Sequence, residues 1–171
     1  ATLVFIAIYQ MNAWADAKMR RPKLPSGEPK PPIAEVTGRQ FEWRIRYAGE
    51  DGVLGVNPST GRTDDVELAN DLHLPVNEEI VLSIKSADVL HSFFLPNLRV
   101  KQDVVPGMKQ FVWFQPTKAG VYDIVCAELC GWGHYKMRGR VTIEPREKFD
   151  SWLAQKHREQ NQAEFTPVEA E

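Results

Sequence analysis

Hydrophobic and polar residues alternate with a period of two through most of the segment 33–145. Between residues 40 and 47, the apolar side chains of Phe41, Trp43, Ile45 and Tyr47 alternate with polar ones. Such alternation is typical of a β-strand with one buried face. The pattern recurs in three further runs, Ile80/Leu82/Ile84, Tyr122/Ile124/Cys126 and Val141/Ile143. Turn-forming residues separate the runs, so the sequence predicts a mainly β fold, either a sandwich or a barrel.

The N-terminal segment has a different pattern. Residues 1–9, ATLVFIAIY, are apolar, and the first charged residue is Asp16. A membrane-spanning helix needs about 20 apolar residues, so this run is too short to span by itself. A buried helix in a soluble protein is one interpretation. We favour the C-terminal part of a transmembrane helix over residues 1–16, with Trp14 in the interfacial aromatic belt.

Residues 17–34 are rich in proline and predict a stiff linker, because proline lacks the backbone donor that helices and sheets need. The linker begins with basic residues, which by the positive-inside rule alone would place the following domain in the cytoplasm. After Pro145, Phe149, Trp152 and Leu153 follow helical spacing. The segment 146–171 is therefore expected to form a short amphipathic helix and an acidic tail that frays from Gln160.

Composition excludes several classes of function. The 171 residues carry a net charge of −2, so the chain has no basic excess with which to bind nucleic acid. Two cysteines are too few for a disulfide-rich scaffold. The chain lacks a C-x-x-C-H motif, which excludes an attached c-type haem. No nucleophile–base set or phosphate-binding loop stands out, so we expect no bond-making chemistry in this chain.

The residues with clear chemical potential lie in the segment 126–137, CAELCGWGHYKM. Cys126, Cys130, His134 and Met137 follow a predicted strand, and His91 lies upstream between two predicted strands. Thiolate and thioether ligands suit copper, whereas zinc would be satisfied without the methionine. A single blue-copper site uses one cysteine, but two coppers bridged by both sulfurs account for all five side chains. The alternatives are a disulfide with ordinary packing of the other residues.

The same segments resemble a known family. The segments GRQFEW (38–43), DVLHSF (88–93) and the loop C-x-E-x-C-G-x-x-H-x-x-M resemble the copper A domain of cytochrome c oxidase subunit II. The resemblance covers about residues 35–145. It implies a cupredoxin-like Greek-key β-barrel anchored by N-terminal transmembrane helices. It also implies that the protein lies in a bacterial inner membrane, with this domain on the periplasmic face. The basic residues of the linker, taken alone, would place the domain in the cytoplasm instead.

The resemblance implies a set of ligands. Cys126 and Cys130 would bridge two coppers. His91 and Met137 would complete the ligands of one copper. His134 and the backbone carbonyl of Glu128 would complete those of the other. The Glu128 carboxylate matches the family residue that reaches a magnesium or similar ion at the boundary with oxidase subunit I. His73 and His157 are not part of this set.

The resemblance also implies a function. The chain would accept electrons from a c-type cytochrome or similar donor and pass them to haem in subunit I. That subunit would reduce oxygen to water and pump protons. Candidates for the place where electrons enter are Phe41, Trp43 and Trp132. The family commonly has tryptophan in place of Phe41.

Charge near the ligand loop departs from the family pattern. The acidic residue that commonly precedes Asp88 is Ala87 here. Five basic residues outnumber three acidic ones in these segments: Lys85, Arg99, Lys101, Lys136 and Arg138 against Asp88, Asp103 and Glu128. We therefore expect a donor to dock through apolar contact, with Trp132 as the candidate surface.

Two alternative functions remain open at this stage. The same copper centre could serve a nitric or nitrous oxide reductase, although the nitrous oxide enzyme would need a large propeller domain that this chain lacks. The chain could instead be a structural oxidase subunit that has no redox role, like quinol-oxidase second subunits without copper. The presence of all five side-chain ligands argues against that second alternative.

Overall fold

The computed structural model describes residues 2–59, 61 and 63–164. Helices, strands and 3-10 turns (η) follow one another along the chain as α1 (Thr2–Lys18), β1 (Ala34–Arg39), β2 (Glu42–Tyr47), β3 (Val66–Ala69), β4 (Asp71–Pro75), β5 (Ile80–Ser86), β6 (His91–Leu95), η1 (Pro96–Leu98), β7 (Val100–Val104), β8 (Gln110–Phe114), β9 (Gly120–Cys126), η2 (His134–Lys136), β10 (Arg138–Glu144) and α2 (Arg146–Glu164). The predicted mainly β fold is confirmed.

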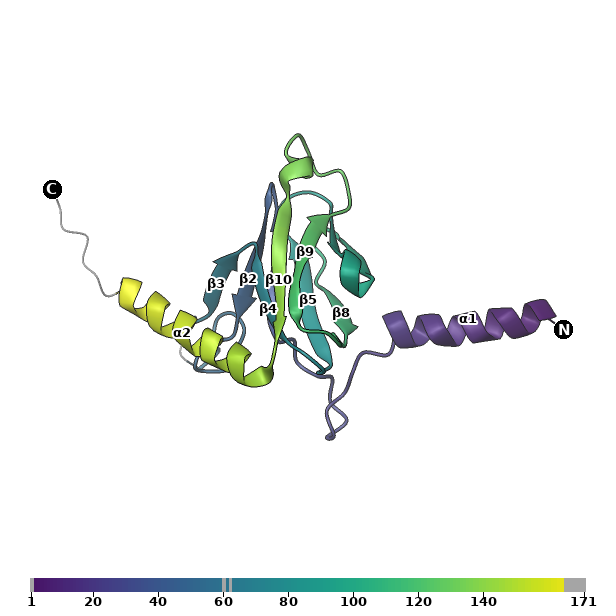
Figure 1. Cartoon of the computed structure of the whole chain (residues 1–171), viewed down its shortest axis with the longest axis horizontal. Coiled ribbons are helices and arrows are strands. Elements are labelled where there is room, and N and C mark those ends of the chain that lie inside the picture. The colour runs from purple at the N-terminus through teal and green to yellow at the C-terminus, as the bar shows by residue number, and fades with distance from the viewer. Residues whose placement is uncertain (1, 60, 62, 165–171) are drawn as a thin grey trace.

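In the described part of the chain, ten strands form two five-stranded sheets, with the orders β3-β2-β1-β5-β8 and β4-β10-β9-β6-β7. Most neighbouring strands are antiparallel, but β1 pairs in parallel with β5, and β4 with β10. The two helices lie outside the sheets, and α1 projects to one side (Figure 1). The β9–β10 connection forms the loop at one end of the domain, opposite the connection that follows α1 (Figure 1).

The chain crosses between the sheets at Asn70, the single residue between β3 and β4. Its φ of 59° is the left-handed conformation that asparagine tolerates better than most residues. The Asn70 N–H donates to the carbonyl of Trp43 in β2, and its own carbonyl accepts from the N–H of Arg140 in β10. The Asn70 side chain also accepts from the Trp43 N–H. One residue thus links both sheets near the ligand loop.

The hydrophobic core lies between the sheets, as the alternation predicts. In β2, Trp43, Ile45 and Tyr47 are all fully buried, and the even-numbered residues between them are more exposed. Phe41 is the exception to the predicted pattern. The strand begins at Glu42, and Phe41 lies half-buried in the preceding turn. Phe41 packs against glycines of the distant β9–β10 loop, a contact that local alternation cannot reveal.

Helix α1 buries none of its described residues. It meets the domain only near its C-terminal end, where the indole N–H of Trp113 donates to the carbonyl of Asp16 and the Lys18 ammonium donates to the carbonyl of Lys101. The buried-helix interpretation is therefore wrong for the described structure. Among the described residues, no helix combines the length and the apolar character that crossing a membrane requires.

Helix α2 lies against β3 and β4 through its apolar side chains, and Phe149 is buried. The helix reaches Glu164, so the expected fraying from Gln160 is wrong. The Gln160 side chain donates to the carbonyl of Asp65 and accepts from the N–H of Glu67, which holds this last part of the helix to β3. The remainder of the expected acidic tail, 165–171, lies outside the described residues.

Candidate metal centre

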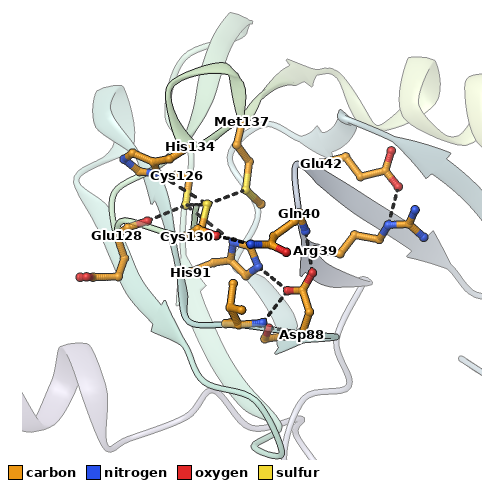
Figure 2. A network of polar contacts seen from close by, with 12 residues as sticks. Arg39, Gln40, Glu42, Asp88, His91, Cys126, Glu128, Cys130, His134 and Met137 are labelled. Atoms are coloured by element: carbon orange, nitrogen blue, oxygen red, sulfur yellow. Dashed lines mark hydrogen bonds and ion pairs between the residues drawn. The ribbon is translucent and has the colours of Figure 1, made fainter. Parts of the chain in front are cut away.

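The sheet that contains β6 and β9 brings the predicted ligands together. His91 is the first residue of β6, rather than lying between strands as predicted, and Cys126 is the last residue of β9. These strands are antiparallel neighbours, with Phe93 opposite Cys126. The loop 127–137 then folds back over the strand ends, and the short helix η2 within it presents His134. Figure 2 shows the five side chains converging from β6, β9 and this loop.

The sulfur atoms form the middle of the cluster. The Sγ atoms of Cys126 and Cys130 lie 3.8 Å apart, and both thiols are free. The Sγ of Cys126 lies 3.9 Å from Nδ1 of His91. The Sγ of Cys130 lies 3.6 Å from Nδ1 of His134 and 3.7 Å from Sδ of Met137. Each cysteine therefore has its own imidazole, and the thioether lies next to the second sulfur.

Glu128 contributes its backbone to the cluster rather than its side chain. Its carbonyl oxygen lies 3.3 Å from the Sγ of Cys126. The carboxylate points away from the sulfur atoms (Figure 2). The backbone oxygen of Glu128 therefore faces the sulfur atoms, and its carboxylate faces outward.

The centre is largely shielded from solvent. His91, Met137 and Cys130 are 0%, 1% and 3% exposed. His134 is only partly buried, so one edge of the centre lies near the surface. Burial of thiolate and imidazole groups is costly unless they are paired or bind a metal, so a metal site accounts for this cluster of sulfur and nitrogen atoms better than packing alone.

Asp88 orients His91. Oδ1 of Asp88 lies 2.8 Å from Nε2 of His91, while Nδ1 of the same ring faces Cys126. A carboxylate only accepts, so Nε2 donates and Nδ1 is left free for a metal. The backbone N–H groups of Gln40 and Val89 also donate to the Asp88 carboxylate, at 2.7 and 2.6 Å. Such a carboxylate behind a ligating histidine fixes its tautomer and ring orientation.

The ligand loop is held from both sides. Its ends are joined by the Cys126 N–H, which donates to the carbonyl of Met137 at 3.1 Å. The Gln40 side-chain amide donates to the carbonyl of Cys130 at 2.6 Å. A Cβ at Gly133 would lie 2.5 Å from the Phe41 ring, so glycine lets the loop approach this ring closely. The loop is therefore preorganised by contacts with the β1–β2 turn.

The two thiols have different acidities. Burial opposes ionisation of Cys126, but hydrogen bonds with His91, His134 and nearby backbone groups together outweigh it and lower the pKa of Cys126 to about 6. Burial, together with the neighbouring Cys126, raises the pKa of Cys130 to about 12. At His91, burial opposes the positive charge, yet Cys126 and Asp88 raise its pKa. Ligation needs both sulfurs as thiolates, so metal binding would release protons.

The three aromatic residues expected where electrons enter have different surroundings. Trp43 is fully buried and packs edge-on against His91, with ring centroids 6.1 Å apart. Trp132 is 80% exposed. Phe41 lies beneath it in an edge-to-face contact with centroids 5.0 Å apart. Phe41 and Trp132 form a pair at the surface, whereas Trp43 lies inside the domain.

The donor set fits copper. Two sulfurs 3.8 Å apart can each contact two metal ions, and the two imidazoles, one thioether and one carbonyl surround them. His91, Cys126 and Cys130 alone place one ligand atom each within 4.8 Å of one another. Soft sulfur ligands with imidazole favour copper over hard cations. A Cys₂His₂ zinc site would leave Met137 without a role.

Sequence reasoning did not identify Asp88, Gln40 or Asn70 as supports of the site. The only local signal was a carboxylate three residues before a candidate ligand histidine. His73 is correctly placed outside the centre. Its ring stacks on Trp152 of α2 at 3.8 Å and lies 2.7 Å from a carboxylate oxygen of Glu144. This histidine has a packing role.

The fold and site define a cupredoxin-like domain with a buried cluster of soft ligands at one end. A family model for the periplasmic domain of cytochrome c oxidase subunit II matches residues 35–144. The chain therefore belongs to the cytochrome c oxidase subunit II family.

Known relatives agree with this assignment. The chain is 39% identical over 137 residues to an alternative cytochrome c oxidase subunit 2 of Bradyrhizobium diazoefficiens. The match covers 71% of this chain but 50% of that relative, so the chain spans half the relative's length.

Two solved structures share the fold. The periplasmic domain of cytochrome oxidase subunit II from Bradyrhizobium japonicum matches with a TM-score of 0.64 and 26% identity. The match covers 82% of this chain and 99% of that one. A second subunit II, captured in a mixed disulfide intermediate with a thioredoxin-like protein, matches with a TM-score of 0.60 and 27% identity. That match covers 82% of this chain and 98% of the other.

Proposed function

We propose that this chain relays single electrons through a dinuclear copper centre. The observation that carries the proposal is the pair of buried free thiols, Cys126 and Cys130, with sulfurs 3.8 Å apart between His91, His134 and Met137. Both cysteines would bridge the two coppers. His91 and Met137 would complete one copper, and His134 with the Glu128 carbonyl the other.

Bound in this way, the copper pair would take up and release one electron shared between both ions. The protein's part is to keep its ligands in place while the charge changes. Asp88 holds the His91 ring, and Gln40 and Phe41 hold the loop that carries Cys130. Met137, which is buried, would exclude water and supply a weak ligand.

We propose further that the chain is the electron-accepting subunit of a haem–copper terminal oxidase. The relatives' names support this role, and the family model describes a periplasmic domain. Electrons would come from a c-type cytochrome or similar donor and continue to haem in oxidase subunit I, which reduces oxygen to water and pumps protons. The domain would lie on the periplasmic face of the bacterial inner membrane, with α1 as part of its anchor. The outward-pointing Glu128 carboxylate would reach a magnesium or similar ion at that subunit boundary.

Electrons would enter through the Phe41–Trp132 pair. Trp132 is exposed on the loop that contains Cys130 and His134, and Phe41 lies beneath it. The burial of Trp43 gives it an internal place beside His91 instead. The tryptophan that the family commonly has in place of Phe41 is thus replaced by two aromatic rings in contact.

Reduction of the cysteines would precede copper binding. Ligation needs free thiolates, and two sulfurs on one loop are positioned to form a disulfide instead. The related subunit II captured in a mixed disulfide with a thioredoxin-like protein supports this order of events. We propose that this chain also requires a thiol reductant before it accepts copper.

Coulometric titration of the copper-loaded chain tests the proposal. We expect one electron to be taken up reversibly for every two coppers bound, at a single potential. Uptake of one electron per copper would indicate two independent sites and contradict the shared centre. Failure to bind copper when the thiols are reduced would contradict the proposal as a whole.

A further inference from the structure

The surface above the candidate ligands is apolar. Leu129, Trp132 and Tyr135 are 77%, 80% and 69% exposed. Leu129 directly precedes the ligand Cys130, and Tyr135 directly follows the ligand His134. Val89 and Leu90, just before the ligand His91, are a further 36% and 38% exposed. Large apolar side chains gathered in this way mark an interaction surface, which we call the loop face.

The centre of the loop face is supported by packing from below. Trp132 contacts Phe41 edge-on, and Phe41 in turn lies against the backbone of Gly131 and Gly133, where a Cβ would come within 3.1 and 2.5 Å of its ring. A tryptophan supported in this way loses little freedom when a partner covers it. Such residues contribute most to protein–protein contacts.

The charges that border the loop face are mainly positive. Lys136 and Arg138 are exposed, and among the described residues neither has an ion-pair partner. The Lys136 ammonium lies 5.4 Å from the Tyr135 ring, at the edge of the apolar surface. In the described part of the β9–β10 loop, the single acidic side chain is that of Glu128.

Apart from Glu128, whose carboxylate points away from the candidate ligands (Figure 2), the acidic residues near the loop face are engaged with other groups. Both oxygens of Asp88 accept hydrogen bonds, from His91 and from two backbone N–H groups. Glu42, beside Phe41, is shared by Arg39 at 3.1 Å and Arg44 at 2.9 Å. A lysine-rich partner would therefore meet unpaired like charges at Lys136 and Arg138 without a free carboxylate cluster to offset them.

We propose that the loop face docks a small electron-carrier protein whose redox group lies under an apolar patch bordered by carboxylates. This inference rests on the proposed function and specifies its donor. The apolar patch would cover Trp132, and the carboxylates would face Lys136 and Arg138. Complementary charges speed association, and like charges disfavour the wrong partner. In the transfer, the reduced haem iron of the carrier loses one electron and the oxidised metal centre gains it; no atom or proton moves.

Stopped-flow reduction of the copper-loaded chain by two probe proteins tests the inference. The probes are an acidic and a lysine-rich c-type cytochrome, each used across a salt series. At low salt, we expect the acidic cytochrome to react faster than the lysine-rich one. Its rate should fall as the salt concentration rises. The variant Lys136→Glu/Arg138→Glu should slow the acidic cytochrome about tenfold at low salt and speed up the lysine-rich one.

A control variant separates the local charge from the net charge. Lys148→Glu/Arg158→Glu makes the same change in net charge on α2, away from the ligand loop (Figure 1). It should change either rate less than about twofold. The variant Trp132→Ala should slow both cytochromes, because both need the apolar contact.

A second measurement does not depend on copper. Quenching of tryptophan fluorescence by iodide is compared with quenching by caesium in the metal-free chain. The fluorescence of Trp132→Phe is subtracted from that of the unaltered chain, which isolates the signal of Trp132. We expect iodide to quench Trp132 more strongly than caesium, and Lys136→Glu/Arg138→Glu to reverse that preference.

Several outcomes would overturn the inference. A faster reaction of the lysine-rich cytochrome that slows with salt, or equal effects of the loop and control variants, would show that the bordering charge does not select the donor. If Trp132→Ala left both rates unchanged but blocked assembly with the oxidase partner, the loop face would be a subunit interface. In each case an intact copper spectrum would leave the proposed function standing, whereas its absence in the unaltered chain would contradict that function directly.

Discussion

Asp88 and His91 are joined by a 2.8 Å hydrogen bond between a carboxylate oxygen and Nε2, which turns Nδ1 of the imidazole toward the Cys126 sulfur. The three-residue spacing between them spans the turn that enters β6. One carboxylate thus fixes the tautomer of a candidate ligand and also accepts from the backbone of the β1–β2 turn. Asp88 therefore couples the position of the candidate metal site to the sheet β3-β2-β1-β5-β8, which carries none of the candidate ligands.

Asp88→Asn should therefore weaken copper binding without changing the type of site. The amide removes the negative charge that supports His91. Its NH₂ group also places a donor where the N–H groups of Gln40, Val89 and His91 need acceptors. We expect the affinity for copper to fall about 10- to 100-fold, as is usual when a partner of a ligating histidine is lost. Competition with a copper chelator measures this.

Asp103→Asn is the matched control, because that carboxylate accepts from Ser92 and Lys101 rather than from a ligand. Equal affinities for the two variants would show that Asp88 does not position His91.

Met137→Leu should retain copper but shift its redox potential. Met137 is buried, and leucine fills a similar volume, so the fold should tolerate the exchange with a cost below about 1.5 kcal/mol. A thioether is a weak ligand whose main effect is on potential. Redox titration and thermal unfolding together check this: an unchanged potential would mean that Met137 only packs, and a loss of all copper would mean that it is a strong ligand.

Metal-free chain kept in air should form a disulfide between Cys126 and Cys130. Their sulfurs are 3.8 Å apart, so a modest movement of the loop reaches bonding distance. Thiol titration should find no free thiols after oxidation, and copper uptake should return once a thiol reductant is added. Two persistently free thiols in aerated protein would show that the loop keeps its sulfurs apart.

Glu128→Gln should leave the copper spectrum unchanged, because the backbone carbonyl and not the carboxylate faces the site. The variant should instead weaken the binding of a hard divalent cation in the assembled oxidase, since an amide is a poorer ligand for such ions. Manganese substituted for magnesium and followed by electron spin resonance measures that binding. Loss of copper from the isolated Glu128→Gln chain would contradict this division of roles.

Local patterns in the sequence predicted those features that depend on nearby residues. The alternation of Trp43, Ile45 and Tyr47 predicted a strand with one buried face, because burial on one side of a sheet repeats every second residue. The spacing of Phe149, Trp152 and Leu153 predicted α2. The ligand loop was evident because four of its ligands lie within twelve residues.

Features that depend on distant contacts were not predictable in this way. Phe41 continues the alternation but leaves the strand, because it packs against Gly131 and Gly133 from a loop 90 residues further along. The bond from Gln40 to the carbonyl of Cys130 has the same origin. The sequence offered both Trp43 and Trp132 as places where electrons enter. The alternation already placed Trp43 on a buried face, but the 80% exposure of Trp132 is evident only in the structure.

Electron spin resonance of the oxidised, copper-loaded chain tests the central claim most directly. Two coppers bridged by Cys126 and Cys130 should give one unpaired electron shared equally by both nuclei, seen as a seven-line hyperfine pattern, with two coppers per chain. Cys126→Ser should abolish that pattern, because a hydroxyl group is a poor bridge between soft metal ions. A four-line spectrum from a single copper in the unaltered chain, or a seven-line spectrum that persists in Cys126→Ser, would contradict the account.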